Sequence, residues 1–219
     1  MTDDQPSDIA SRTSSSAVRT GPPDRPQLRV TVEPTLPDPS VATFQQLYEA
    51  AFGPLRVRAA ARHVLYEHEF RAEMADPRID KIVAWADDGE PVGLTTFTNQ
   101  LESVPWISPE FFRSRYPEQA ARNAIFYLGF VLVHPHAMHS GAFRDMVAEA
   151  YRRTIAARGV CGWDICGFND GQFQLGRASE KIITAWGNTL VETVDHQTFY
   201  AAHLAEHGNP AHNGSASTE

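Results

Sequence analysis

Apolar residues along the chain alternate between the two-residue spacing of strands and the 3.6-residue spacing of helices. Short runs rich in β-branched residues predict strands, and apolar positions three or four residues apart predict helices. The predicted order is strand–helix–helix–strand–strand, an insertion, then strand–helix–strand–helix–strand. We therefore expect an α/β (α+β) domain with a mixed, mostly antiparallel sheet and helices on both faces. The strands are predicted at residues 28–33, 81–86, 91–98, 125–133 and 160–166, and residues 189–194 and 198–204 complete the domain.

The predicted helices have recognisable starts and ends. Ser40 is expected to cap the first helix, and the second runs from about Arg58 to Ala75. Ser108, followed by proline and glutamate, is a favourable helix start. The two remaining helices are predicted after the loop 136–141, ending at Gly159, and from Asn169 to Trp186.

The composition of the two ends differs from that of the middle. Residues 1–26 and 207–219 are rich in small and polar side chains, which predicts disordered tails around one domain at 27–206. Residues 101–122 interrupt the strand–helix rhythm with an aromatic-rich insertion. Such a segment packs on the sheet as a covering helix, or it forms a lid or wall of a substrate pocket.

Charge and hydropathy narrow the classes of function. The formal net charge of −8 argues against a nucleic-acid partner, because phosphate binding needs a basic face. No apolar run approaches the roughly 20 residues of a membrane helix, so no membrane partner is expected. The N-terminus lacks a secretory pattern, and two cysteines, Cys161 and Cys166, give no disulfide framework. These features predict a cytoplasmic protein.

Histidines form two patterns that resemble metal-ligand spacing. His134, His136 and His139 form one pattern, and His203 and His207 lie four residues apart. The first pattern lies on a loop that is better suited to an anion, and the second lies beside the C-terminal tail. We therefore predict exposed histidines and no metal.

The loop after the apolar strand 125–133 carries the most specific motif. The strand ends in Val133-His134-Pro135, and Gly141 then opens a long helix. A helix N-terminus leaves backbone N–H groups without partners and carries a partial positive charge. Glycine at that point lets the backbone approach a phosphate group closely.

This strand–loop–helix resembles the GCN5-related N-acetyltransferase (GNAT) superfamily, in which a Val-x-Pro precedes an Arg/Gln-x-x-Gly-x-Gly/Ala loop. Met138 stands where the family has Arg or Gln, and Phe143 stands where it has a small residue. The resemblance implies a GNAT-like fold and an acetyl-CoA or other acyl-CoA co-substrate. The residues that it assigns to coenzyme A binding are Leu132, Val133, Met138, His139, Ser140, Gly141, Ala142, Phe143 and Asn169.

The same resemblance implies acyl transfer to an amino group of a small molecule or peptide. Such a transfer needs a neutral amine, a stabilised oxyanion and a protonated thiolate. Relatives often use a strand glutamate and a helix tyrosine, but this chain has Tyr127 at the strand position and no tyrosine near Ile183. The candidate catalytic residues are therefore Tyr127, Glu110, Asp164 and His134.

Two alternatives stay open at this level. The missing helix tyrosine and Met138 favour a repurposed, non-catalytic member that binds without transferring. The apolar insertion favours a transferase for longer acyl chains. A homodimer is possible in either case, since edge strands often pair between subunits in such folds.

Overall fold

The computed structural model describes residues 28–187 and 189–203, and both predicted tails lie outside these residues. Five strands form one sheet in sequence order, antiparallel except for the parallel last pair. The predicted fold class is therefore confirmed. The strands are β1 (Arg29–Glu33), β2 (Asp80–Trp85), β3 (Pro91–Thr98), β4 (Ile125–Val133) and β5 (Val160–Gly162).

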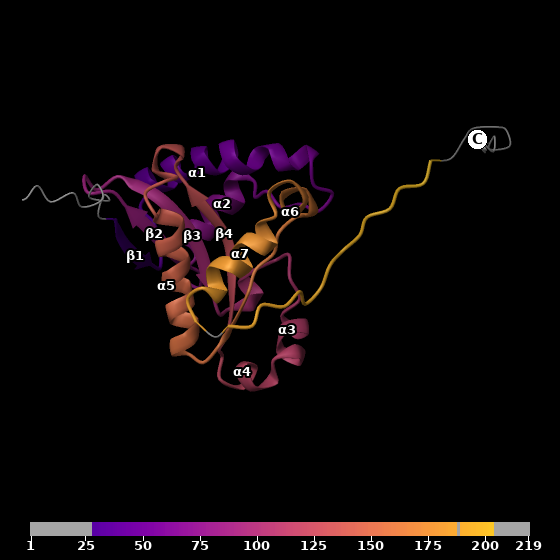
Figure 1. Cartoon of the computed structure of the whole chain (residues 1–219). Helices are drawn as coiled ribbons and strands as arrows, with labels where there is room; N and C mark the ends of the chain where they lie inside the picture. Colours follow the sequence, from indigo (N-terminus) through magenta and orange to yellow (C-terminus); the bar gives the residue numbers. More distant parts are fainter. Residues whose placement is uncertain (1–27, 188, 204–219) are drawn as a thin grey trace, which may run out of the picture.

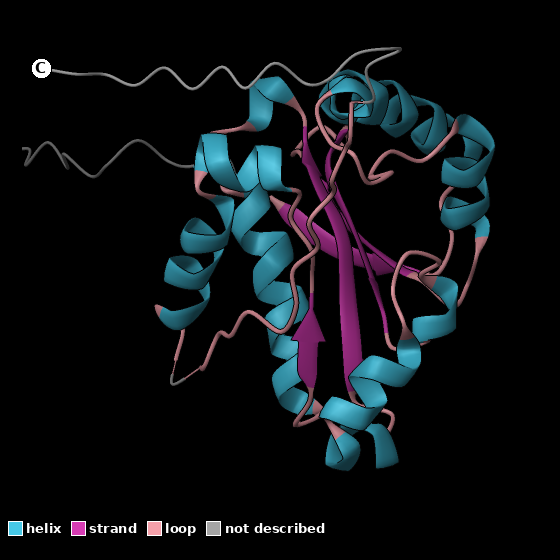
Figure 2. Cartoon of the chain, turned by 90° about the vertical axis from the view of Figure 1, so that its right-hand side faces the viewer, coloured by secondary structure: helices cyan, strands magenta, loops and turns pink. Residues whose placement is uncertain are grey.

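Helices cover both faces of this sheet, as Figures 1 and 2 show. On one face lie α1 (Asp38–Phe52) and α2 (Glu67–Ala75), whose buried Phe44, Phe70 and Met74 pack with Leu94 and Leu132 of the sheet. The other face is covered by α5 (Ala142–Ala156), which buries a stripe of small and apolar side chains against β2 and β3. Two apolar cores therefore hold the central strands between them.

The aromatic-rich insertion closes one end of the sheet. It contains η2 (Leu101–Ser103), α3 (Pro109–Arg115) and α4 (Pro117–Ala121). The predicted start of α3 is confirmed, because the backbone N–H of Phe111 donates to Ser108 Oγ at 3.3 Å. Phe112 is buried with its ring against Tyr127 of β4. The insertion is thus a packed cover, and it also brings Trp106 to the end of the sheet.

The N-terminal helices differ from the prediction. The first begins at Asp38 with proline in its first turn, so Ser40 lies inside the helix and does not cap it. After η1 (Gly53–Val57), the predicted helix from Arg58 starts only at Glu67. The intervening loop is held because Leu65 is buried and its N–H donates to the Tyr48 hydroxyl at 3.1 Å.

The C-terminal part differs as well. The strand predicted at 160–166 pairs only over Val160–Gly162, and the predicted helix from Asn169 is broken at Gln174, whose φ is 51°. The result is two helices, α6 (Gly167–Phe173) and α7 (Leu175–Thr184). The strands expected at 189–194 and 198–204 are absent from residues 189–203, and Leu204 lies outside the described residues. Glu192 instead binds Arg115 and Tyr116 of the insertion.

No helix within residues 28–187 and 189–203 is long and apolar enough to span a bilayer.

Candidate functional site

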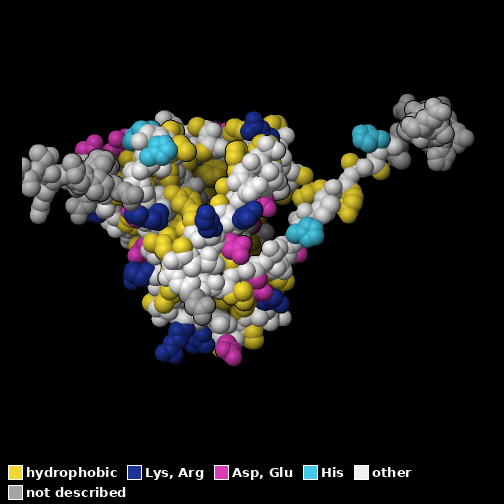
Figure 3. All heavy atoms as spheres, viewed as in Figure 1, with side chains coloured by type: hydrophobic (Ala, Val, Ile, Leu, Met, Phe, Trp, Pro, Cys, Tyr) yellow, Lys and Arg dark blue, Asp and Glu magenta, His cyan; other side chains and the backbone are white. Residues whose placement is uncertain are grey.

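The sheet splits between its last two strands. β5 pairs with β4 at only three positions, of which Tyr127–Gly162 is the last. From Leu128 to Val133, β4 keeps β3 on one edge and has no strand on the other among the described residues. Alternate backbone N–H and C=O groups on that edge are therefore available to an extended ligand. Figure 3 shows a hollow with a hydrophobic lining on this face, between the start of α5 and α6.

The loop before α5 (η3, Pro135–Ala137, and residues 138–141) ends beside this split. Gly141 has a φ of 97°, a left-handed conformation that other residues adopt only with strain. The first helical bond runs from the N–H of Asp145 to the Gly141 carbonyl at 3.0 Å. The amides of Phe143 and Arg144 consequently precede the helical hydrogen-bond ladder, which makes this terminus suitable for an anion.

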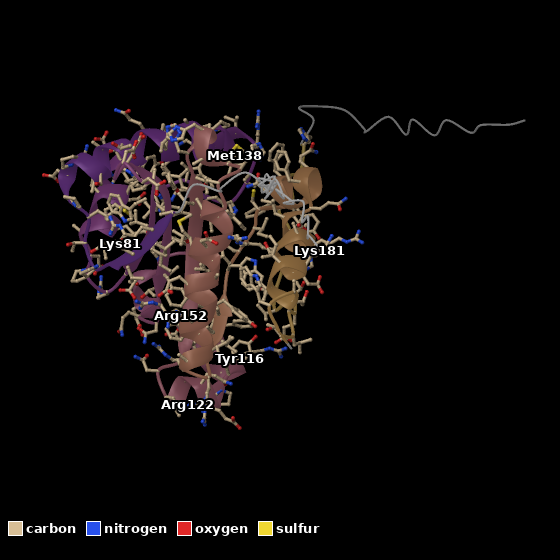
Figure 4. The ribbon with its side chains drawn as sticks, turned by 60° about the vertical axis from the view of Figure 1, so that its left-hand side comes forward. Lys81, Tyr116, Arg122, Met138, Arg152 and Lys181 are labelled. Carbon is tan, nitrogen blue, oxygen red and sulfur yellow. The ribbon has the colours of Figure 1, made fainter. Side chains whose placement is uncertain are left out.

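The residues predicted to bind coenzyme A lie around this loop. Met138, 67% exposed, and the exposed His139 lie in the loop, and Figure 4 places Met138 at the opposite end of α5 from Arg152. Ser140 Oγ accepts from the N–H of Ala142 at 3.2 Å, which satisfies one terminal amide. The side chain of Ala142 is buried in the core, so only the backbone of this residue is available at the N-terminus of α5.

The remaining residues that were predicted to bind coenzyme A lie along the split between β4 and β5. Leu132 and Val133 pair with β3 on their other edge, opposite Leu94 and Gly93. Phe143 is 40% exposed at the start of α5, and Asn169 is half-buried on α6. The structure therefore arranges all nine residues along the loop, the strand and the neighbouring helix.

A polar cluster lies where the split begins. Tyr127, almost fully buried, donates its hydroxyl hydrogen to Asp164 Oδ1, which also accepts from Trp106 Nε1 at 3.2 Å. The other carboxylate oxygen, Oδ2, lies 3.4 Å from His63 Nδ1. Asp164 was expected to need a partner, and it has three. They come from β4, the insertion and the loop before α2.

The electrostatics of the cluster follow from these contacts. Burial raises the pKa of Tyr127, and the charge of Asp164 raises it further, so the phenol stays protonated. For Asp164, burial acts to raise the pKa, but hydrogen bonds with His63, Tyr127 and Trp106 outweigh it and the pKa is lowered. The cluster thus contains an ionised carboxylate that accepts hydrogen bonds from Tyr127 and Trp106 and lies within ion-pair distance of His63.

The other two catalytic candidates lie elsewhere. Glu110 is exposed on α3 and accepts a hydrogen bond from its neighbour Ser108 at 3.2 Å. His134, at the end of β4, has its ring 3.8 Å from that of His136, centroid to centroid. Only Tyr127 and Asp164 of the four candidates are therefore brought together.

A carboxylate that the sequence did not suggest faces β4 from the other side. Glu73 of α2 lines a small cavity with Thr96, Trp106, Tyr127 and Gly129. Burial raises its pKa to about 7, against the lowering effects of a Thr96 hydrogen bond and the charge of Lys81. The sequence offered one indication of this role: Glu73 directly precedes Met74, which lies on the buried side of α2.

A larger cavity of about 460 Å³ shares Phe97 and Thr98 with the Glu73 cavity. It is lined by the stacked rings of Phe97 and Phe126 and by the ion pair of Arg153 and Asp80, 3.1 Å apart. These residues lie near the C-terminal end of α5, whereas Gly141 begins that helix. We assign it no part in the site.

Metal ligands do not gather in the described part of the chain. Within residues 28–187 and 189–203, no group of three His, Cys, Asp or Glu side chains is arranged to hold an ion. His207 of the second predicted pattern lies outside the described residues.

Comparisons with known proteins place the chain beside acetyltransferases. No family model matches the sequence, and no curated protein matches it. A ribosomal-protein-alanine N-acetyltransferase from Brucella melitensis biovar Abortus 2308 is similar in structure, with 10% identity, 83% of this chain and 100% of that chain covered, and a TM-score of 0.43. The aminoglycoside 6'-N-acetyltransferase AAC(6')-Ih from Acinetobacter baumannii has 11% identity, 82% and 100% coverage, and a TM-score of 0.46.

A third similar structure is an aminoglycoside acetyltransferase from an uncultured soil metagenomic sample, in complex with trehalose. It has 13% identity, covers 80% of this chain and 97% of its own, and has a TM-score of 0.44. All three of these proteins are acetyltransferases by name. At these low identities and TM-scores, the likeness assigns no activity to this chain.

Proposed function

We propose that this chain is an acyl-coenzyme A-dependent N-acyltransferase that transfers an acetyl or longer acyl group to an amino group. The observation that carries the proposal is the split of β4 from β5 beside the start of α5. The exposed edge of β4 offers N–H and C=O groups that can pair with the pantetheine arm. The N-terminus of α5 beside it offers N–H groups that can bind the pyrophosphate.

Acyl-coenzyme A, the acyl donor, would be bound mainly by backbone groups of β4 and α5. The amides of Phe143 and Arg144 would hold the pyrophosphate, since the first helical bond begins only at Asp145. The edge of β4 from Leu128 to Val133 would pair with the amides of the pantetheine arm. The donor supplies the activated acyl group. A side chain at Gly141 would strain the turn that brings these parts together.

The polar cluster would act on the reacting groups from the start of the split. Asp164 fixes the ring of His63 through Nδ1 and holds Tyr127 as a protonated donor. A carboxylate-oriented histidine is a common acid–base arrangement, and it lies at the point where β4 loses its neighbour. In this proposal His63 is the group available to move protons, and Asp164, which also accepts the Tyr127 hydroxyl hydrogen, is a positioning residue.

The test is ligand-dependent thermal unfolding with coenzyme A, acetyl-CoA and longer acyl-CoA thioesters. A ligand at ~100 times its dissociation constant stabilises the folded state by about 2.7 kcal/mol, which shifts the melting temperature by a few degrees. We expect a saturable shift whose size depends on acyl length. No shift with any thioester, from folded protein, would reject the proposal.

Two glycines provide a matched pair of variants. Gly141 and Gly89 both have positive φ, 97° and 85°, but Gly89 lies in the hairpin turn between β2 and β3. Alanine should destabilise the protein by about 1 kcal/mol at either position. Only Gly141→Ala should weaken coenzyme A binding, by about tenfold or more. Equal loss of binding in both variants would contradict the assigned site.

A non-catalytic protein that binds acyl-coenzyme A is the second candidate. It is favoured by the absence of tyrosine near Ile183 of α7 and by the Tyr127 hydroxyl, which is directed at Asp164. Release of coenzyme A from acetyl-CoA in the presence of any primary amine would exclude this candidate.

A further inference from the structure

A small cavity lies on the α2 side of the split. It is bounded by α2, β3, β4 and the insertion, and its volume is about 10 Å³, roughly the room of one water-sized group. Glu73 is the only acidic side chain among the residues that line it. Its polar and aromatic lining is completed by Thr96, Thr98, Ser103, Trp106 and Tyr127.

This cavity lies where the donor edge begins. Tyr127 is the last residue of β4 that pairs with β5, and Gly129 follows two residues later. The β3–β4 register shifts between Thr95 and Phe97, so Thr96 lies opposite the irregular part of β4. A group held by Glu73 therefore lies next to the first residues of β4 that have a free edge.

Gly129 allows the side chain of Thr96 to lie close to the backbone of β4. A Cβ atom built on it would collide with Thr96 Oγ1 and would lie 4.0 Å from Glu73 Oε1. Any other residue would therefore enter the space between the strand and the carboxylate. The missing side chain lets Thr96 approach β4 closely, next to the Glu73 carboxylate.

The charges around Glu73 leave its carboxylate without a close cationic partner among the described residues. Lys81, on β2, directs its ammonium to the carbonyl oxygens of Pro34, Asp76 and Ile79, at 2.6–2.9 Å. The other ionisable groups that face Glu73 are Asp76, at the end of α2, Tyr48, on α1, and Tyr127, on β4, which lines the same cavity. A partly buried carboxylate without a cationic partner attracts a small cation.

From this geometry we infer that Glu73 binds the ammonium head of the acceptor, removes one of its protons, and restricts the acceptor to primary amines on an unbranched carbon. The inference rests on the proposed function and adds the acceptor class and a catalytic residue. An ammonium group is about the size of a water molecule and so fits the cavity, whereas an N,N-dimethylated nitrogen does not.

The proton balance is simple. The Glu73 carboxylate takes one proton from R–NH3+, and the freed nitrogen lone pair forms the new C–N bond to the acyl carbon. The C–S bond breaks, and the sulfur leaves with its electron pair and receives the second nitrogen proton. Glu73 then returns its proton to solvent. The carboxyl pKa of about 7 suits this exchange near neutral pH.

The binding test measures the affinities of n-butylamine and N,N-dimethylbutylamine by NMR titration. The protein is saturated with coenzyme A and kept at pH 8. Glu73→Gln should weaken n-butylamine binding at least tenfold. The control is Glu67→Gln, the same change at an exposed position of α2, where Glu67 pairs with Arg71 at 3.2 Å. The wild type should bind the dimethylated probe at least tenfold more weakly than n-butylamine. Equal binding of the two probes, or equal binding of n-butylamine by the two variants, would overturn the inference.

The kinetic test measures coenzyme A release from acetyl-CoA with n-butylamine across pH. The wild-type rate should rise through about pH 7, and Glu73→Gln should lower it about 100-fold and remove the rise. Equal rates in the two glutamine variants would refute the role of Glu73. As a control for folding, coenzyme A should still raise the melting temperature of Glu73→Gln. Failure of coenzyme A to bind the wild type would reject the proposed function itself, whereas normal coenzyme A binding without an effect of Glu73 rejects only this inference.

Discussion

His63 Nδ1 lies 3.4 Å from Asp164 Oδ2, although one residue precedes α2 and the other follows β5. The same carboxylate accepts the hydroxyl hydrogen of Tyr127 and the indole N–H of Trp106. One side chain thereby joins four segments at the point where the sheet splits. This position makes Asp164 a residue whose removal should affect stability as well as the site.

We expect Asp164→Asn to lower the free energy of unfolding by about 1–2 kcal/mol at pH 7, because a partly exposed, charged acceptor of two hydrogen bonds becomes a neutral one. The lowered pKa of Asp164 gives the sign of the pH dependence. Its stabilisation is present above the unfolded pKa near ~4 and is lost as pH falls through the folded value. Urea unfolding of the wild type and Asp164→Asn at pH 7 and at pH 3.5 measures the difference in unfolding free energy. The control is Asp87→Asn, the same change at an exposed position in the hairpin turn. A penalty that does not shrink at low pH would contradict the assignment.

Glu73 should have the opposite pH dependence. Its folded pKa of about 7 lies above the usual 4.5, so the folded state binds more protons than the unfolded state between these values. The wild type should therefore lose on the order of 2–3 kcal/mol relative to Glu73→Gln as pH rises from 4.5 to 7. Unfolding free energies of both proteins at pH 5 and pH 8 give the comparison. A difference that is the same at both pH values would show that Glu73 is not buried as described.

The contact between Gly129 and Thr96 can be tested by a double-mutant cycle. Gly129→Ala places Cβ against Thr96 Oγ1 and should destabilise the protein by about 1–3 kcal/mol. Thr96→Ala removes that oxygen, and the remaining Cβ would lie 3.7 Å away, an ordinary contact. The double variant should therefore be more stable than the sum of the single changes predicts, by about 1 kcal/mol. Strict additivity of the unfolding free energies would disprove the close approach.

Lys81 should be important for folding and not for binding. It is fully buried, and the carbonyl oxygens of Pro34, Asp76 and Ile79 would each lose its ammonium as a donor in Lys81→Met. We expect a loss of about 3 kcal/mol or more. Lys181, exposed on α7, provides the matched change, and Lys181→Met should stay within about 0.5 kcal/mol. Figure 4 labels both side chains. Similar melting temperatures for the two variants would contradict this prediction.

Local patterns in the sequence were sufficient for most of the framework. The alternation at 81–98 predicted the β2–β3 hairpin, and the apolar run at 125–133 predicted β4. Gly141 indicated the start of α5 because a glycine before a helix lets the backbone approach an anion closely. These features depend on neighbouring residues, so the sequence determined them by itself.

Contacts between distant segments decided the remainder. Burial of Leu65 against Tyr48 keeps residues 58–66 out of the predicted helix and places His63 beside Asp164. The early end of β5 opens the split in the sheet, and the packing of α2 onto β3 and β4 places Glu73 in the small cavity beside β4. A carboxylate gains its partners and its pKa only from the groups that packing brings around it, and no spacing along the chain contains that information.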